Sequence, residues 1–298
     1  MTAPPLRPLD PAYRTILVPL DGSLFAEGAL QTARQLAARF GATMHTVSVV
    51  VSGFESRERA RAESAQALGT DPDDPRVQVE VDTDVARAVQ RRARELDAWL
   101  ICLATHGRGR GGTPIGSTAR EIIERTGEPV VVTGPLVRHP DAADQTAVPP
   151  LGVDRFVVCV DGSPRSEQGI PVAAAWAHAL GMKLSIVTVA EPCPPPERIG
   201  APWRRRHGPN EDAEEYLRRL GEQWALDAPG LDTFVVYDQI GPGPGLRNHL
   251  RAHPTGLLAV TIQLGAPLPH LVFGHGAADI VHAASAPVLV IPGTTKDR

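Results

Sequence analysis

Residues 16–50 read ILVPLDGSLFAEGALQTARQLAARFGATMHTVSVV, and residues 156–190 read FVVCVDGSPRSEQGIPVAAAWAHALGMKLSIVTVA. Each stretch is an apolar run, an Asp-Gly-Ser, a helix-like segment that ends at a glycine, and a second apolar run. The two Asp-Gly-Ser motifs begin at Asp21 and Asp161, which lie 140 positions apart. A repeat of this length indicates a duplicated domain, because solenoid units are only about 20–50 residues long.

The length and composition fit two globular domains. The chain has 298 residues, of which 42% are hydrophobic and 21% charged, and its formal net charge is −4. This charge gives no reason to expect nucleic acid or a membrane as a partner. The three cysteines are widely spaced, which supports neither a disulfide framework nor a zinc site. Without an apolar signal segment or a membrane-spanning run, we expect a cytoplasmic protein.

Apolar runs alternate with amphipathic stretches along the first copy. The predicted strands are residues 15–20, 43–50, 77–81, 99–104 and 129–132. The first predicted helix begins after Ser23, which can cap it, and ends at Gly41. Two further helices are predicted over 84–97 and 117–125. Strands that are apolar throughout and alternate with helices are typical of a parallel sheet with right-handed crossovers.

The second copy repeats this plan after a proline-containing stretch at 138–150, which reads as a linker. Its closing strand is predicted at 287–291. Pro171 lies within its first predicted helix and should kink it, because proline lacks the N–H that the helix needs. The segment 191–230 is longer than its counterpart in the first copy and holds several prolines.

A glycine-rich stretch follows the fourth predicted strand, and residues 104–122 read ATHGRGRGGTPIGSTAREI. Glycines let the backbone turn sharply and approach a ligand closely. Gly116, Ser117 and Thr118 then open a helix, whose free amides and partial positive charge suit phosphate. The pattern predicts a phosphate site. The alternative interpretation is a flexible loop followed by a helix that Ser117 caps.

Asp21 ends the first predicted strand, and Gly107 follows the fourth. Ligands of parallel sheets bind beyond the carboxyl ends of the strands, so we expect these two residues to border one crevice. An aspartate there can hydrogen-bond a ribose or hold Mg²⁺ through water. The alternative role of Asp21, and more so of Asp161, is to form an Asp-Gly turn.

Other nucleotide and catalytic motifs fit less well. Gly107, Gly109 and Gly112 match G-x-G-x-x-G, but they follow the fourth strand and no acidic residue ends the next strand, so a dinucleotide fold is disfavoured. The sequence has no G-x-x-x-x-G-K-[ST] motif. We find no Ser/His/Asp order, carboxylate pair or His/Cys cluster that indicates a catalytic centre.

Taken together, these motifs resemble those of the universal stress protein family. The resemblance rests on ILVPLDGS at 16–23, on ATHGRG and IGSTA within 104–119, and on EPVVV at 128–132 with its echo APVLV at 286–290. The chain looks like a tandem member of this family. The resemblance places the domains at 13–138 and 154–293, with a linker at 139–153.

For the fold, the resemblance implies an α/β architecture. Each domain should hold a five-stranded parallel sheet with helices on both faces, of the adenine nucleotide alpha hydrolase-like or HUP type. The two domains should pack as an intramolecular pseudo-dimer about an approximate two-fold axis. A homodimer of whole chains is a further option, and the sequence indicates no particular protein partner.

The resemblance also implies an ATP site in the first domain, with Mg²⁺ held by Asp21 as an option. AMP or cyclic AMP are ligands that the same fold can hold. Asp21 would contact the ribose or the metal. The other implied contacts are Pro19, Leu20 and the backbone of Val49 at the adenine, Leu103 and Ala104 at the nucleoside, and Gly107, Arg108, Gly116, Ser117 and Thr118 at the phosphates.

The chain departs from the family's ATP-binding loop in both copies. That loop is Gly, two residues, Gly, nine residues, and then Gly-Ser or Gly-Thr. Here Ala104 stands for the first glycine, and eight residues separate Gly107 from Gly116. In the second copy Leu264 replaces the second glycine, and a histidine follows Gly274. We therefore expect weak ATP binding or none in the second copy.

The expected function is that of an ATP-binding universal stress protein, a stress-adaptive regulator that holds nucleotide mainly in its N-terminal domain. Any ATP hydrolysis should be slow, because no base or arginine finger is evident. Two alternatives stay open. One is an interaction module that binds no nucleotide, and the other is an enzyme that consumes ATP.

Overall fold

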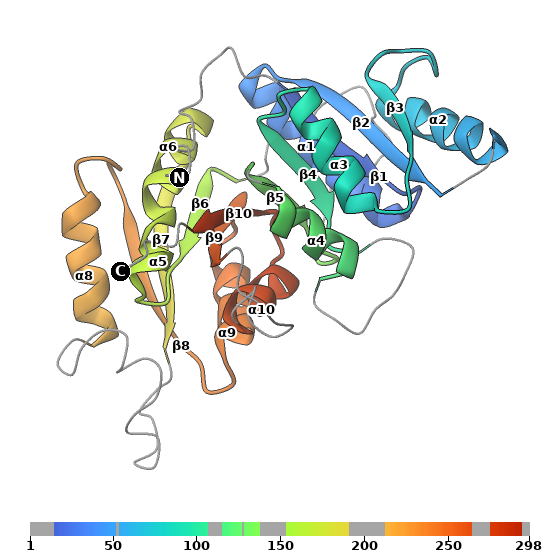
Figure 1. Cartoon of the computed structure of the whole chain (residues 1–298). Coiled ribbons are helices and arrows are strands. Elements are labelled where there is room, and N and C mark those ends of the chain that lie inside the picture. The colour runs from blue at the N-terminus through green and yellow to red at the C-terminus, as the bar shows by residue number, and fades with distance from the viewer. Residues whose placement is uncertain are drawn as a thin grey trace, which may run out of the picture. The chain divides into compact units, whose positions relative to one another are not determined.

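The computed structural model describes residues 15–51, 54–106, 115–126, 128–137, 153–190, 212–263 and 275–293. The chain divides into two compact units. We call the unit formed by residues 10–151 domain one, and the unit that contains 152–298 domain two (Figure 1). Most of the predicted linker, residues 139–152, lies outside the described residues, and the pseudo-two-fold packing of the domains stays a prediction.

Strands and helices alternate along domain one (Figure 1). They are β1 (Thr15–Leu20), α1 (Leu24–Phe40), β2 (Thr43–Val50), α2 (Phe54–Leu68), β3 (Val77–Val81), α3 (Val85–Glu95), β4 (Leu100–Ala104), α4 (Ser117–Arg125) and β5 (Val130–Thr133). The strands pair in parallel in the order β3-β2-β1-β4-β5. Right-handed crossovers in this order put α1 and α2 on one face and α3 and α4 on the other. The predicted five-stranded parallel sheet is confirmed.

Local sequence explains where the first helices begin and end. The Ser23 side chain accepts a hydrogen bond from the Ala26 amide at the start of α1, and Gly41 ends the helix with a φ of 62°. Both features were predicted. The helix predicted over 84–97 begins one residue later, because Asp84 is its N-cap and its side chain accepts from the Arg87 amide.

Domain two repeats the same plan (Figure 1). Its elements are β6 (Arg155–Cys159), α5 (Pro164–Glu167), α6 (Gly169–Leu180), β7 (Lys183–Ala190), α8 (Ala213–Trp224), β8 (Asp232–Tyr237), α9 (Pro242–Ala252), β9 (Leu257–Gln263), α10 (His275–Ala283) and β10 (Val288–Gly293). These strands also pair in parallel, in the order β10-β9-β6-β7-β8.

The strand registers confirm the repeat. In domain one, Thr15 pairs with Thr43 between β1 and β2. In domain two, Arg155 pairs with Lys183 between β6 and β7. Each residue of the second pair lies 140 positions after its counterpart, so the two copies share one register as well as one order of elements.

The first helix of the second copy was predicted as one helix with a kink at Pro171. The structure corrects this, because the segment divides into α5 and α6 at Gln168, three residues earlier. The physical reason is the proline itself. Pro171 cannot donate to the carbonyl of Glu167, and its ring crowds that carbonyl, so a continuous helix across this point is disfavoured.

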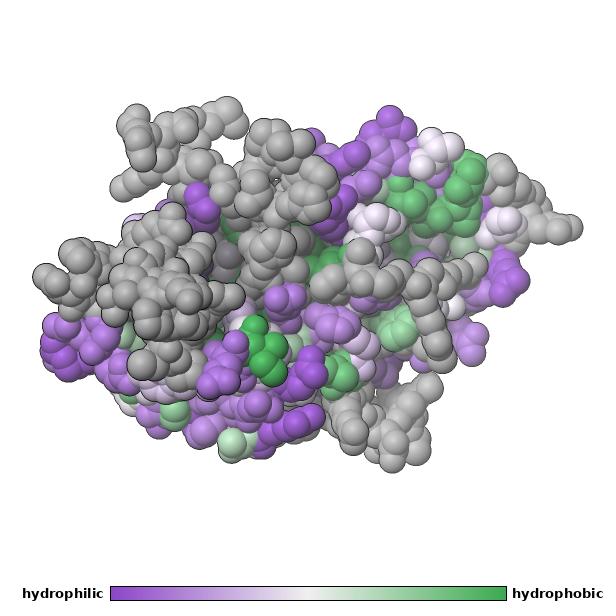
Figure 2. Space-filling model, turned by 90° about the horizontal axis from the view of Figure 1, so that it is seen from below, coloured by the Kyte–Doolittle hydropathy of each residue, from purple (hydrophilic) through white to green (hydrophobic). Residues whose placement is uncertain are grey.

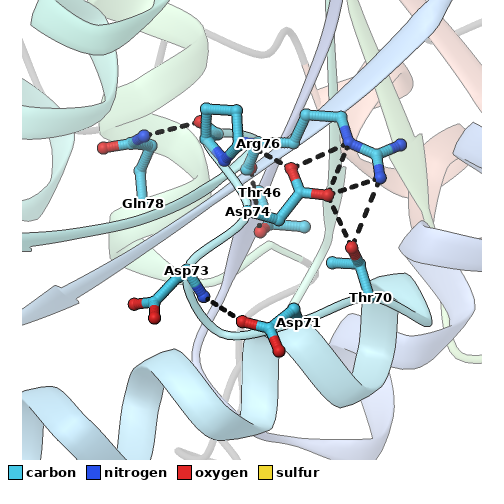
Figure 3. A network of polar contacts seen from close by, with 8 residues as sticks. Thr46, Thr70, Asp71, Asp73, Asp74, Arg76 and Gln78 are labelled. Atoms are coloured by element: carbon cyan, nitrogen blue, oxygen red, sulfur yellow. Dashed lines mark hydrogen bonds and ion pairs between the residues drawn. The ribbon is translucent and has the colours of Figure 1, made fainter.

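A polar network holds the connection between α2 and β3 (Figure 3). The Asp74 carboxylate accepts hydrogen bonds from the Arg76 guanidinium and the Thr70 hydroxyl. The Arg76 contact holds the pKa of the Asp74 carboxyl well below its usual range. The Arg76 carbonyl accepts from the Thr46 amide, which ties this turn to β2. The network precedes β3 and is therefore structural support at the amino ends of the strands.

The described surface is mostly hydrophilic on the face that Figure 2 shows. Among the described residues, the exposed large hydrophobic side chains are Val51, Val81, Leu136, Leu226, Tyr237 and Ile240. In the described part of the chain, no helix is both long and apolar enough to cross a membrane.

At one contact between a helix and a strand of the core, the sizes of the two residues differ between the copies, and the two differences offset each other. A Cβ on Gly169 of α6 would collide with the Thr261 hydroxyl of β9. By the shared registers, the corresponding residues of domain one are Ala29 and Ala104. A larger strand residue thus accompanies a smaller helix residue in domain two.

This compensation predicts the stability of two variants of domain two. Gly169→Ala should lower the free energy of unfolding by about 1–3 kcal/mol, because threonine has a stiff χ1 and cannot easily turn away. Adding Thr261→Ala should remove most of that loss, since it recreates the alanine pair of domain one. Urea unfolding of both variants, with Thr261→Ala alone as control, measures this. A Gly169→Ala protein as stable as the parent would show that the packing tolerates the Cβ.

Candidate functional site

The candidate site lies at the carboxyl ends of β1 and β4. These strands are neighbours, and Ile16 and Leu17 pair in parallel with Leu100 and Ile101. The strand order reverses between them, since the chain proceeds from β1 to β2 and β3 on one side and from β4 to β5 on the other. Ligands of open α/β sheets bind at such a switch point.

Asp21 forms the turn that leaves β1. Its Oδ1 accepts a hydrogen bond from the Ser23 amide at 3.0 Å, and Gly22 between them has a φ of 72°. The turn role, which the sequence offered as the alternative for Asp21, is therefore present. The same turn holds the carboxylate at the carboxyl edge of the sheet, where the residue is exposed to solvent.

The start of α4 is drawn close to the end of β4. The Gly116 amide donates to the Thr105 carbonyl oxygen at 2.8 Å. A Cβ on Gly116 would lie 3.2 Å from that oxygen, which is tighter than most real contacts, so glycine suits this approach. Gly116 is the N-cap of α4 and has no side chain with which to cap the helix.

The first turn of α4 is suited to a negatively charged group. It holds no acidic residue, whereas the first turn of α1 holds Glu27. Ser117 and Thr118 are exposed there. The partial positive charge of the helix N-terminus is thus not offset from within that turn, and two hydroxyls lie beside it. A helix start of this kind can bind a phosphate group, and the phosphate site stays a prediction.

Thr105 ties the end of β4 to β5 and contacts His106, the residue before the glycine-rich loop. Its amide donates to the Thr133 carbonyl oxygen at 3.0 Å, and its hydroxyl lies 3.0 Å from Nδ1 of His106. Thr105 is 1% exposed. The Thr133 hydroxyl in turn bonds with that of Thr32 at 3.0 Å, which anchors the segment to α1. Sequence reasoning missed Thr105 and Thr133, which carry no motif.

The predicted nucleoside contacts lie on three adjacent strands, β2, β1 and β4. Leu103 is 3% exposed, while the others are half-buried, namely Pro19, Leu20, Val49 and Ala104. Two exposed valines, which the sequence analysis did not predict as contacts, lie at the ends of the neighbouring strands. Val51 directly follows β2, and Val81 ends β3, next to Val50 in register. They extend the apolar edge beyond Val49.

Two predicted phosphate contacts, Gly107 and Arg108, fall in residues 107–114, outside the described part of the chain. The structure therefore describes the predicted site on both sides of the glycine-rich loop but not the loop itself. It puts Asp21 and the start of α4 at the ends of neighbouring strands.

In domain two the matching turn is also held by internal hydrogen bonds. Oδ1 of Asp161 accepts from both the Ser163 amide and the Ser163 hydroxyl, at 3.0 and 2.6 Å. The Asp161 amide donates to the Ser166 hydroxyl at 3.1 Å. Ala26 stands at the position of Ser166 in domain one. The decisive residues of the second loop, Leu264 and Gly274, lie outside the described residues.

A buried tyrosine adds to this polar group in domain two. Tyr216 of α8 is 0% exposed, and the Arg219 guanidinium lies 5.2 Å from the centre of its ring. Arg219 also lies 3.6 Å from the Glu167 carboxylate. Burial raises the pKa of Tyr216, and the nearby Glu167 and Asp161 carboxylates raise it further. These side chains lie near Asp161, which is exposed to solvent as Asp21 is.

The described residues give little support for a metal site or a reactive cysteine. No group of three or more His, Cys, Asp or Glu side chains among them is arranged to hold a metal ion. Burial raises the pKa of Cys159 to about 12 and raises that of Cys102 as well. Buried thiols with a raised pKa are poor nucleophiles.

Comparison with known proteins gives the family. The model of the Universal stress protein family matches residues 12–134 and again 152–292. No curated protein matches the sequence. A universal stress protein from Archaeoglobus fulgidus DSM 4304 has 15% identity and a TM-score of 0.63, with 95% of this chain and 97% of that chain covered.

Two further solved structures are similar. A putative universal stress protein from Pseudomonas aeruginosa UCBPP-PA14 has 16% identity and a TM-score of 0.58, with 95% of this chain and 94% of that chain covered. A universal stress protein solved in complex with cAMP has 20% identity and a TM-score of 0.38, covering 47% of this chain and 98% of its own.

The longer matches extend over nearly the whole chain and agree in fold. The family model matches twice, once in each copy of the repeat. The chain belongs to the universal stress protein family and carries two of its domains in tandem.

Proposed function

We propose that this protein binds ATP in domain one and acts as a stress-adaptive regulator. One observation carries the proposal. The Gly116 amide bonds to the Thr105 carbonyl at the end of β4, which brings the uncapped start of α4, with exposed Ser117 and Thr118, to the edge where Asp21 lies. A helix N-terminus without acidic residues favours a phosphate group.

Each part of the nucleotide then has a proposed partner. The base packs against the apolar edge formed by Pro19, Leu20 and Val49. Asp21 accepts hydrogen bonds from the ribose hydroxyls. The phosphates lie at the start of α4, where Arg108 of the glycine-rich loop supplies a positive charge.

Mg²⁺ is an additional part of the proposal. Mg²⁺ keeps several waters and often binds one or two carboxylates together with substrate phosphates. The single exposed carboxylate of Asp21 fits this mode, with the phosphates as the other ligands. The metal would neutralise phosphate charge, while the residues of the chain bind and orient the nucleotide.

The regulatory role follows from what the proposed residues do. They bind and orient a nucleotide, and none is assigned to activate water. Phosphoryl transfer needs a positioned nucleophile and stabilisation of the charge that develops. ATP hydrolysis should therefore be slow, and the bound nucleotide would act as a signal that other components read.

The alternative is an interaction module without nucleotide, and a specific observation favours it. Only eight residues separate Gly107 from Gly116, and Ala104 replaces a glycine of the family's loop. A shorter loop can fail to reach around the phosphates. An ATP-consuming enzyme is the third option, and it requires the release of AMP or pyrophosphate.

The first test identifies what the protein carries. We expect the protein, purified without added nucleotide and then denatured, to release about one adenine nucleotide per chain, measured by mass spectrometry. One site is expected because Leu264 replaces the second loop glycine in domain two and a histidine follows Gly274. Two nucleotides per chain would contradict the inactive second copy. No release, together with no calorimetric binding of ATP, AMP or cyclic AMP, would favour the interaction module.

The duplication supplies a matched pair of variants for the second test. Asp21→Ala should weaken ATP binding by about tenfold to a hundredfold, the effect of losing a hydrogen bond to a charged group. Asp161→Ala removes the same kind of turn from domain two and should leave the affinity nearly unchanged. Titration calorimetry with and without EDTA measures both and separates the contribution of Mg²⁺.

The control is the turn itself, because both aspartates accept a hydrogen bond from the serine amide two residues later. The two variants should therefore lose similar stability in thermal unfolding. A large loss of affinity in Asp161→Ala, with Asp21→Ala unaffected, would place the working site in domain two instead.

A further inference from the structure

Two stacked histidines close the carboxyl end of α9 in domain two. We call His249 and His253 the histidine pair. Their ring centres lie 4.3 Å apart with the ring planes inclined by 20°. They are four residues apart, so they lie on the same face of the helix. His253 is the C-cap of α9, and its Nδ1 lies 3.2 Å from the His249 carbonyl oxygen.

The histidine pair packs on the sheet. The Phe234 ring of β8 lies 4.9 Å from each imidazole, measured between ring centres. His249 is 8% exposed, and its Nε2 is buried with no hydrogen-bond partner among the described residues. A neutral imidazole tolerates this position, but a protonated one would carry a buried N–H and a charge without an acceptor.

The charges around the histidine pair are mainly positive. The Arg155 guanidinium of β6 lies 5.7 Å from the Phe234 ring centre and bonds to the Ser185 hydroxyl at 2.9 Å. The Asp232 carboxylate of β8 is shared by Arg155 and by Lys183 of β7, at 3.4 and 2.9 Å. Among the side chains that the structure describes on α9 and its neighbour α10, the other titratable or charged ones are Arg247, Arg251, Asp279 and His282.

These surroundings keep His249 neutral near pH 7. Burial, together with His253 and Arg155, lowers the pKa of His249 to about 4. In the unfolded chain a histidine titrates near pH 6.5. The unfolded state therefore binds the proton first as the pH falls, and the packed state loses stability between about pH 6.5 and pH 4.

We propose that the histidine pair makes domain two acid-responsive: proton uptake at His249 releases the carboxyl-terminal turn of α9 from the sheet. The device is separate from the proposed nucleotide site. It lies at the amino ends of β6 to β8, whereas the nucleotide site lies at the carboxyl ends of the strands of domain one.

Domain one has no such pair at the corresponding positions. Helices α3 and α9 have the same length, and Arg92 and Leu96 of domain one correspond to His249 and His253. Domain one does hold His45 on β2, whose pKa is lowered by burial and by Arg92 and Arg76. Acid therefore acts on both domains, and the test must isolate the contribution of His249.

Hydrogen exchange of the whole protein at pH 7.5 and pH 5.0 isolates the contribution of His249, because it reports amide protection helix by helix. After correction for intrinsic exchange rates, amide protection in α9 should fall on the order of tenfold in the parent between these pH values. His249→Leu should show little such fall, because leucine fills the site without titrating. His178→Gln, at an exposed position of α6, should behave as the parent. An equal fall in His249→Leu would overturn the proposal.

A second measurement needs no variant at His249. Histidine proton resonances of the parent, followed by NMR from pH 7.5 to pH 4, should include one imidazole that stays neutral until α9 loses protection. His253→Phe keeps a stacked ring and removes a neighbour that lowers the pKa of His249. In this variant the buried imidazole should therefore take up its proton at a higher pH than in the parent. A buried histidine that titrates near pH 6.5 with α9 still protected would contradict the mechanism.

Discussion

The parallel pairing of β1 with β4 is the interaction on which the candidate site of domain one depends. It makes the carboxyl ends of two strands neighbours although 83 residues separate Asp21 from Thr105 in sequence. The Asp21 turn leaves one strand, and Thr105 leaves the other. The hydrogen bond from the Gly116 amide to the Thr105 carbonyl then adds the start of α4 to the same edge.

Sequence patterns predicted most of this architecture because its signals are local. The Ser23 cap, the Gly41 stop and the apolar strands each depend on a few neighbouring residues. The division at Gln168 was missed because it depends on how the helix as a whole accommodates Pro171. Thr105 could not be predicted as a site residue, since its roles come from strand pairing and from the approach of Gly116.

The duplication separates what the fold needs from what the proposed ligand needs. Both copies keep the strand order, the Asp-Gly-Ser turn and the serine cap, so these features serve the fold at least. The copies differ around the turn. In domain two Ser166 bonds the Asp161 amide, and Thr261 packs against Gly169 where domain one has two alanines. Neither hydroxyl contact can form in domain one, which has Ala26 and Ala104 at the positions of Ser166 and Thr261.

Helix α9 links the two edges of domain two. Its N-cap is Gly241, whose amide donates to the Asp238 carboxylate, and a Cβ on Gly245 would lie 2.8 Å from Cγ1 of Val189. Val189 corresponds to Val49, a proposed base contact of domain one. The histidine pair lies at the other end of the same helix. A proton taken up there would therefore act on the helix that also packs beside Val189, the counterpart of a proposed base contact.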